Sequence, residues 1–299
     1  MEKIIDLHIH TTYSDGNLTP FEVIDEAVKN RVHTISIADH DSIDAYTRKL
    51  FEYAKAKGVN IIPGVEISAK KKGLSVHLLG YNFDINNEEL NNKLKLLRNA
   101  RHDYLHNVAE KLKQLGYILN VEKLSKIDAV TKAHIAQDVV ENASNKELLI
   151  KEFGYIPERG EFIETIMNAG CPAYVEKETI SPADAVQLLK RAGAKTILAH
   201  PVAYKEAKLT VQEVVDLTLD ANVDGIESNY IYIDRNHRKI NEIDMWNDIA
   251  LENNFITTIG SDFHLKDEIH PTIGLVNEKI KISQEEIDQI IFNLTGESN

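Results

Sequence analysis

The feature that most restricts the fold is a repeated alternation of short apolar runs and amphipathic segments. Seven runs have the length and composition of buried β-strands, and they occupy residues 3–9, 34–38, 60–67, 74–81, 195–199, 223–227 and 255–260. Amphipathic segments typical of helices follow several of them, at residues 20–30, 43–57, 182–192, 210–221 and 240–253. Strands that alternate with helices of this length predict an α/β protein, either a parallel barrel or a doubly wound sheet.

The alternation stops between residues 91 and 179, where the pattern is helical. Apolar side chains recur there and just before it at steps of three and four, which predicts one buried helix face: Leu90, Leu94, Leu97, Leu105, Val108, Leu112 and Leu115. We therefore predict a discontinuous domain of residues 1–90 and 180–299, with residues 91–179 inserted as a helical subdomain. Arg101 interrupts the apolar face, one turn after Arg98. Its guanidinium either extends to solvent or turns inward to meet an anion.

Side chains that commonly bind metals stand at six of the seven predicted strands. His8 and His10 are two residues apart, so on a strand they point to the same face, although this pair alone is as typical of two core histidines. Asp15 follows in a turn. The later strands supply His40, Glu66, His77, His200, Asp262 and His264. We expect these groups to converge, because the carboxyl ends of barrel strands meet on one rim. The run at 223–227 offers nothing obvious.

The converging set holds six imidazoles and three carboxylates, which is too many donors for one ion, since a catalytic zinc typically uses three protein ligands. Clustering nine such groups without cations would carry a large desolvation and repulsion cost. We predict three divalent ions, and nitrogen and oxygen donors without thiolate suit Mn²⁺, Fe²⁺ or Zn²⁺. Three carboxylates and three divalent ions leave a balance of about +3, which favours a phosphate-bearing substrate.

Composition excludes several classes of function. The formal net charge of -13 disfavours long polyanions such as duplex nucleic acid. Residues 93–132 form an exception, with nine Lys or Arg against four Asp or Glu, so a small phosphorylated substrate stays compatible. We expect no membrane contact, because no apolar run approaches a membrane span and no signal-peptide pattern precedes Asp6. The single cysteine, Cys171, excludes an internal disulfide and fits a reducing cytoplasm.

Taken together, the motifs resemble the PHP (polymerase and histidinol phosphatase) family, and within it the TrpH-like phosphoesterases. They are DLHIH at 6–10, SDG at 14–16, ADHDS at 38–42, IPGVEI at 62–67, VHLLGY at 76–81, LAHP at 198–201 and GSDFH at 260–264. The resemblance implies a distorted (βα)7 barrel with a trinuclear centre. It assigns His8, His10, Glu66 and Asp262 to the first ion, Glu66, His77 and His200 to the second, and Asp15, His40 and His264 to the third.

The same resemblance implies hydrolysis of phosphate monoesters of small nucleotides, such as nucleoside 3′,5′-bisphosphates or AMP-like compounds, or cleavage at nucleotide ends. A hydroxide held by the metals would attack phosphorus. The inserted subdomain would cover the active site, with Arg98, Arg101 and His134 as substrate contacts. The alternatives are a histidinol-phosphate-type phosphatase, a 5′-3′ exoribonuclease on short oligonucleotides, an amidohydrolase-like hydrolase and a non-catalytic metal scaffold.

Two features keep more than one interpretation. Asp39 and Asp41 flank His40, where they either orient an imidazole from behind or cap a helix that starts near Ile43. The stretch 229–239 matches no motif that we recognise. The sequence names neither the metal, nor the base, nor the oligomeric state.

Overall fold

The computed structural model of this protein describes residues 3–127, 129–176, 179–234, 236–274 and 282–297. The chain divides into two compact units, one made of Met1–Lys93 with Ile180–Asn299 and the other of Leu94–Thr179. Each unit has a buried apolar core of its own. That the second unit covers the active site stays a prediction.

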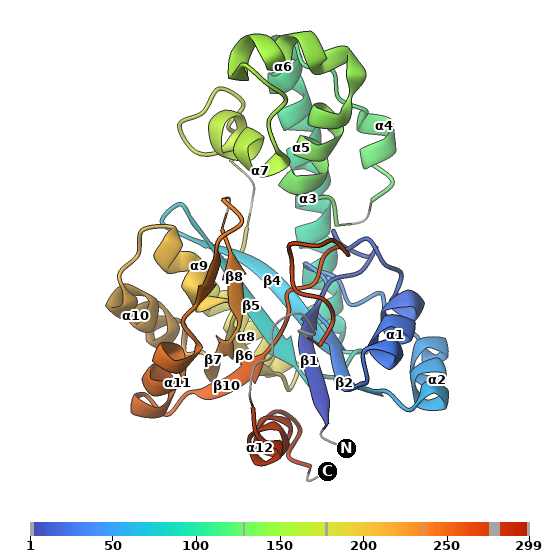
Figure 1. The fold of residues 1–299 in the computed structure, drawn as a ribbon, viewed down its shortest axis with the longest axis vertical. Helices are drawn as coiled ribbons and strands as arrows, with labels where there is room; N and C mark the ends of the chain where they lie inside the picture. The colour runs from blue at the N-terminus through green and yellow to red at the C-terminus, as the bar shows by residue number, and fades with distance from the viewer. Residues whose placement is uncertain (1–2, 128, 177–178, 235, 275–281, 298–299) are drawn as a thin grey trace. The chain divides into compact units, whose positions relative to one another are not determined.

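Two main sheets form the first unit (Figure 1). The smaller has the order β1-β2-β3 and is parallel throughout, with β1 at Ile4–Ile9, β2 at Val32–Ile37 and β3 at Asn60–Ile61. The larger has the order β10-β7-β6-β5-β4, with strands at Ile256–Ile259, Gly225–Asn229, Lys195–Leu198, Leu74–Tyr81 and Gly64–Lys71. Strands β10, β7 and β6 are parallel, whereas β5 runs antiparallel to both of its neighbours.

The α/β class is therefore confirmed, whereas a closed (βα)7 barrel stays a prediction, because the described ladders form separate sheets. Isolated parallel bridges join Ile9 to Phe263 and His40 to Glu66, and so connect the two sheets. The single strand predicted over 60–67 is wrong: it divides at Pro63, which has no N–H to give to a ladder. The expectation of parallel strands alone is also wrong, since β4 and β5 form an antiparallel hairpin.

Five helices lie within or largely within the predicted segments: α1 at Pro20–Lys29, α2 at Arg48–Lys57, α8 at Pro182–Arg191, α10 at Val211–Ala221 and α11 at Ile243–Glu252. Two more, α9 at Pro201–Glu206 and α12 at Gln284–Thr295, were not predicted. The hydroxyls of Thr19, Thr47 and Ser181 accept a hydrogen bond from the first turn of the helix that each precedes. Figure 1 shows α1 and α2 beside β1 and β2. Four side chains of α12 pack into the sheet core: Ile287, Ile290, Ile291 and Leu294.

The start of α2 differs from the prediction, and the stretch after β7, for which none was made, has a defined structure. Helix α2 starts five residues later than predicted, because the Tyr46 hydroxyl donates to the Ile37 carbonyl at 2.6 Å and fixes the preceding segment as a turn. The unrecognised stretch after β7 contains a short antiparallel hairpin, β8 at Ile231–Ile233 and β9 at Lys239–Asn241.

The second unit is helical. Most of α3 (Glu88–Gln114) belongs to it, followed by α4 (Val121–Leu124), α5 (Lys132–Glu141), η1 (Ala143–Asn145), α6 (Lys146–Phe153), α7 (Arg159–Phe162) and η2 (Ile163–Met167). The predicted apolar face of α3 is buried at all of its positions through Leu112, and Tyr104 lies on it as well. Among the described residues, no helix is both long and apolar enough to cross a bilayer.

Candidate metal centre

The first strand and the turn after it place three of the candidate ligands. His8 lies on β1 and His10 directly follows its last residue; both are fully buried, with their Nε2 atoms 3.1 Å apart. The turn then folds back, because the Gly16 N–H donates to the Thr11 carbonyl. A Cβ atom at Gly16 would lie 2.3 Å from the His10 carbonyl oxygen, so only glycine allows this close approach. Asp15 is thereby brought to 3.7 Å from His10 Nδ1.

The hairpin β4–β5 supplies the central carboxylate. Glu66 is 1% exposed and lies within β4, not at the end of a parallel strand as the sequence suggested. Its Oε1 lies 3.0 Å from His77 Nδ1, on β5, and 3.2 Å from His200 Nε2. Its Oε2 faces the other side, 2.9 Å from His40 Nδ1, 3.3 Å from His10 Nε2 and 3.5 Å from His8 Nε2. Each oxygen of one carboxylate therefore meets different imidazoles.

The segments after β6 and β10 supply the remaining groups. His200 follows β6 with a φ of 30°, a left-handed backbone just before Pro201. Asp262 follows β10 and also has a positive φ, of 53°. Its Oδ1 lies 3.2 Å from His10 Nε2 and 3.4 Å from His8 Nε2. His264, two residues later, reaches Asp15 Oδ1 with its Nε2 at 3.4 Å.

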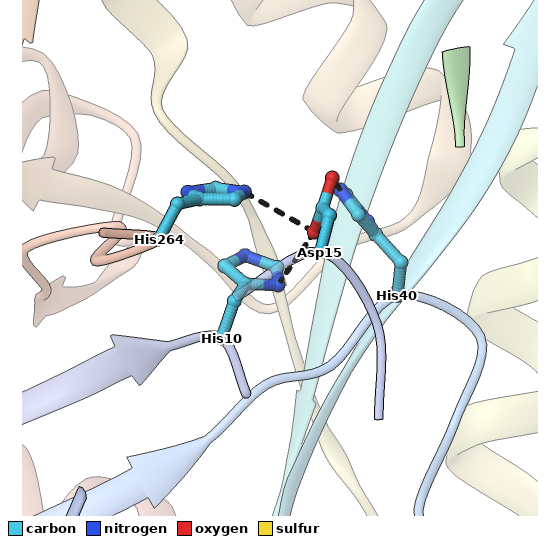
Figure 2. A group of neighbouring side chains, drawn as sticks. All are labelled: His10, Asp15, His40 and His264. Carbon is cyan, nitrogen blue, oxygen red and sulfur yellow. Dashed lines mark ion pairs between the residues drawn. The ribbon is translucent and has the colours of Figure 1, made fainter. Parts of the chain in front are cut away.

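Three groups of donor atoms result, and in each the ligand atoms lie within 4.8 Å of one another: His10 with Asp15, His40 and His264; His8 with His10 and Asp262; His40 with Glu66 and His77. Figure 2 shows the first group, in which Asp15 faces three imidazoles. These groups contain eight of the nine predicted residues, and the ninth, His200, joins them through its contact with Glu66 Oε1 at 3.2 Å. The groups overlap with the ligand sets that the resemblance implies without matching them, since His10 and His40 each join two groups, and the assignment to individual ions stays a prediction.

The donor set fits divalent cations. Four buried polar atoms of the cluster have no hydrogen-bond partner in the described structure: Asp15 Oδ1, His40 Nδ1, Glu66 Oε2 and His200 Nδ1. Histidines are the ion-pair partners of all three carboxylates. Buried lone pairs that face one another without an intervening proton are costly, whereas a divalent ion satisfies several of them at once. Nitrogen and oxygen donors suit the borderline and harder divalent ions.

The pKa values of the clustered side chains depend strongly on one another. Burial lowers the pKa of His10, but Asp262 and Glu66 outweigh it and raise this pKa to about 10. Burial dominates at His40 and lowers its pKa to about 4. Burial also raises the pKa of Glu66, but the surrounding imidazoles, first His40, hold that pKa well below its usual range. Charge on each group therefore depends on its neighbours, and protons bound to imidazoles compete with metal ions for the same lone pairs.

Glu227 is the functional side chain that sequence reasoning missed, since the sixth predicted strand was expected to offer nothing. It is fully buried on β7, and its two carboxylate oxygens lie 2.9 and 3.1 Å from His8 Nδ1. The available signal was an acidic residue within an otherwise apolar strand, because buried carboxylates are rare unless they are paired. This additional carboxylate makes the local positive charge smaller than the predicted balance of about +3.

Three buried aspartates hold the loops that carry candidate ligands. Asp39 accepts hydrogen bonds from the Thr11 N–H and from the Thr11 and Ser14 hydroxyls. Asp41 accepts from the Ser68 N–H. Asp6 accepts from Ser261 N–H and hydroxyl, and burial raises its pKa to about 6. The alternative in which Asp39 or Asp41 caps α2 is wrong, since Thr47 caps that helix.

Tyr230, at the entry to the β8–β9 hairpin, also reaches the centre. Its hydroxyl donates to Asp262 Oδ2 at 3.2 Å, and its ring centroid lies 5.7 Å from that of His200. Asp262 therefore has one oxygen held by a tyrosine and the other directed at His8 and His10. The stretch that no motif identified thus supplies a group to the ligand cluster.

The predicted substrate contacts lie in the second unit. Arg101 is 4% exposed, which rules out a guanidinium extended into solvent, and its Nη1 lies 3.4 Å from the Val130 carbonyl oxygen. Arg98 is partly buried. His134 has a structural function as well, because its Nδ1 accepts a hydrogen bond from the Thr131 N–H in a capping box. Their contact with substrate stays a prediction.

The sequence and the fold are both similar to those of known proteins. The 5′-3′ exoribonuclease Rnm of Escherichia coli K12 is 28% identical over 87% of this chain and 85% of its own length. The 3′,5′-nucleoside bisphosphate phosphatase of Chromobacterium violaceum is 25% identical over 90% of both chains. A solved structure from Bifidobacterium adolescentis, provisionally described as a metal-dependent phosphoesterase, has the same fold, with a TM-score of 0.75 at 22% identity over 97% of this chain and 96% of its own. A family model described as the PHP domain matches residues 6–169, more than half of the sequence and six of the nine clustered residues, and the chain therefore belongs to the PHP domain family.

Proposed function

We propose that this PHP protein hydrolyses phosphoester bonds of small nucleotides, using three divalent ions held by the nine clustered residues. The substrate is a phosphate monoester, such as a nucleoside 3′,5′-bisphosphate or an AMP-like compound, or the phosphoester at the end of a short oligonucleotide. The observation that carries the proposal is the meeting of six imidazoles and three carboxylates, among which four buried polar atoms have no hydrogen-bond partner in the described structure.

The chain is a metal-dependent phosphoester hydrolase. Its relatives are named for different substrates, RNA in one case and a nucleoside bisphosphate in the other, but both names describe cleavage of a phosphoester. Divalent ions bound at such a site lower the pKa of water and stabilise charge on phosphoryl oxygens. This chain's contribution is to hold the donors in fixed positions and to keep bulk water from them.

Glu66 is the residue best placed to serve two ions. Its Oε1 lies near His77 and His200, while its Oε2 lies near His8, His10 and His40. In the proposed assignment, the third ion is bound by Asp15, His40 and His264. Arg98, Arg101 and His134 of the inserted unit are the proposed substrate contacts, because an arginine pairs with phosphate oxygens through two parallel hydrogen bonds.

Exonucleolytic removal of nucleotides from a 5′ end is the second candidate, supported by the relative at 28% identity. Both reactions attack the same kind of phosphorus, so a substrate panel separates them. Purified protein, loaded in turn with Mn²⁺, Fe²⁺ and Zn²⁺ and checked by elemental analysis, is assayed with a nucleoside 3′,5′-bisphosphate, AMP, a 5′-phosphorylated short RNA, histidinol phosphate and a cyclic amide. Inorganic phosphate from the bisphosphate supports the first candidate, and 5′-mononucleotides from RNA support the second.

Other outcomes of this panel would overturn the proposal. Turnover of histidinol phosphate alone would identify a histidinol-phosphate-type phosphatase, and hydrolysis of the amide alone an amidohydrolase-like enzyme. Metal-loaded protein that binds nucleotide but cleaves nothing would be a scaffold.

His40→Ala tests the part played by the third ion. We expect loss of about one ion per chain and of turnover, with the fold retained, because the His40 ring contacts Asp15, Glu66 and other imidazoles of the ligand cluster. His33→Ala is the matched control, since His33 lies on β2, where its Nδ1 accepts from the N–H of Ile4, the first residue of β1. Turnover at the wild-type rate in His40→Ala would remove the third ion from the reaction.

A further inference from the structure

Glu227 touches two candidate ligands that come from different strands. Its Oε1 lies 2.9 Å from His8 Nδ1, and its Oε2 accepts a hydrogen bond from the backbone N–H of His200 at 2.9 Å. The side chain is fully buried, and it is one residue before Ser228 on β7. It does not belong to any of the three groups of donor atoms, so it stands behind the centre.

We propose that Glu227 is a positioning residue that fixes the tautomer of His8 and ties His8 to His200, so that both imidazoles are set before a metal ion arrives. The inference rests on the proposed metal-dependent function. It assigns to Glu227 no contact with metal or substrate.

The tautomer of His8 follows from which of the contacting groups can donate a hydrogen bond. An ionised carboxylate only accepts hydrogen bonds, so the short contact with Glu227 requires the proton of His8 to be on Nδ1. In the neutral ring, the lone pair is then on Nε2. That atom faces the centre, 3.1 Å from His10 Nε2, 3.4 Å from Asp262 Oδ1 and 3.5 Å from Glu66 Oε2. A carboxylate behind a ligating histidine also raises the basicity of the ring.

The bond to His200 holds a strained piece of backbone. His200 has a φ of 30°, which a residue with a side chain rarely adopts, and Pro201 follows as the first residue of α9. The hydrogen bond from its N–H to Glu227 stabilises this conformation, which directs the His200 ring to Glu66. Gly260 completes the arrangement, because a Cβ there would lie 2.3 Å from His8 Cβ and 2.4 Å from Glu227 Oε1.

Glu227→Gln is the informative change. The amide has nearly the same shape but only one accepting oxygen, so it satisfies either the His8 Nδ1–H or the His200 N–H and presents an NH₂ group to the other. Asp224→Asn is the matched control, since Asp224 lies just before the same strand, accepts from the Thr196 N–H at 2.8 Å, and belongs to none of the three groups of donor atoms. Both variants exchange a carboxylate for an amide.

The experiment measures affinity for Zn²⁺ by competition with a chromogenic chelator, and the His8 tautomer in the metal-free protein by two-bond ¹H–¹⁵N NMR correlations. We expect Glu227→Gln to bind Zn²⁺ about 10–100-fold more weakly than wild type, the range typical for groups that orient ligands, and to lose the single Nδ1–H pattern. Asp224→Asn should match wild type in both measurements.

Several results would overturn the inference. One is wild-type Zn²⁺ affinity in Glu227→Gln, and another is an Nε2–H tautomer of His8 in the wild type. Should Glu227→Gln fail to fold, Glu227→Asp, which keeps two accepting oxygens, is expected to fold and bind Zn²⁺. If instead both variants fold, as judged by circular dichroism, and neither binds Zn²⁺, Glu227 would be assigned to packing. If wild-type protein binds no divalent ion, the proposed function itself falls, and the two failures are thereby distinguished.

Discussion

Removal of the Asp39 carboxylate should release the turn that carries Asp15. Asp39 is fully buried and accepts three short hydrogen bonds, from the Thr11 N–H at 2.7 Å, the Thr11 hydroxyl at 2.6 Å and the Ser14 hydroxyl at 2.6 Å. Asp15 itself makes its recorded ion pairs with histidines of the cluster. Asp39→Ala therefore leaves the Asp15 side chain unchanged but removes the group that holds its loop.

The magnitude follows from the donors left behind. The Ser14 hydroxyl keeps His10 Nδ1 as a neighbour at 3.3 Å, whereas the Thr11 N–H and hydroxyl lose their acceptor. Each buried donor without a partner costs about 1–3 kcal/mol, so Asp39→Ala should lower the free energy of unfolding by about 3 kcal/mol. Asp39→Asn keeps one accepting oxygen for the Thr11 N–H and the Ser14 hydroxyl, and should lose about 1 kcal/mol.

Urea unfolding of the chelator-treated protein measures this difference, and elemental analysis measures the metal content of the reloaded protein. We expect Asp39→Ala to lose one ion per chain after dialysis, and Asp39→Asn to keep it. Asp25→Ala, on the exposed face of α1, is the control and should leave the metal content unchanged. The reasoning is refuted if Asp39→Ala unfolds at the same urea concentration as Asp39→Asn and retains all of its metal.

Three further predictions concern the centre and its substrate. The pKa of His10 is about 10 in the folded protein against an ordinary 6.5, so its protonation stabilises the metal-free protein by up to about 5 kcal/mol below pH 6.5. This stability is lost as the pH rises toward 10, and urea unfolding with chelator across this range should show the decline. Metal affinity should rise over the same range, because protons and metal ions compete for the imidazoles. Tyr230→Phe removes the donor to Asp262 Oδ2 and should weaken metal binding by about tenfold or less, measured by chelator competition. Arg101→Ala should raise KM for a nucleoside bisphosphate more than for p-nitrophenyl phosphate, since only the former offers a second phosphate.

Each of these has a plain contrary result. Metal-free protein equally stable at pH 6.5 and 9.5 would mean that the imidazoles are neutral throughout. An unchanged metal affinity in Tyr230→Phe would mean that the hydrogen bond from its hydroxyl does not help Asp262 to bind metal. Equal changes in KM for both substrates of Arg101→Ala would identify Arg101 as a packing residue, in line with its burial beside Val130.

Local pattern predicted the elements well where the signal is local. The helices predicted over 20–30 and 182–192 start at the predicted residues, behind the caps Thr19 and Ser181, because a cap depends on only four consecutive residues. The late start of α2 was missed for the opposite reason. The Tyr46 hydroxyl acts on Ile37, nine residues earlier in the sequence, and no window of neighbouring residues contains that information.

What the sequence determined by itself is the inventory: an α/β chain with an interrupted rhythm, and nine imidazoles and carboxylates next to apolar runs. Tertiary structure decided what those groups face. Glu66 and His77 reach the others from an antiparallel hairpin, and Glu227 stands behind His8 from a strand that seemed chemically silent. The physical reason is that hydrogen bonds and ion pairs act over about 3 Å in space, whereas the sequence orders residues only along the chain.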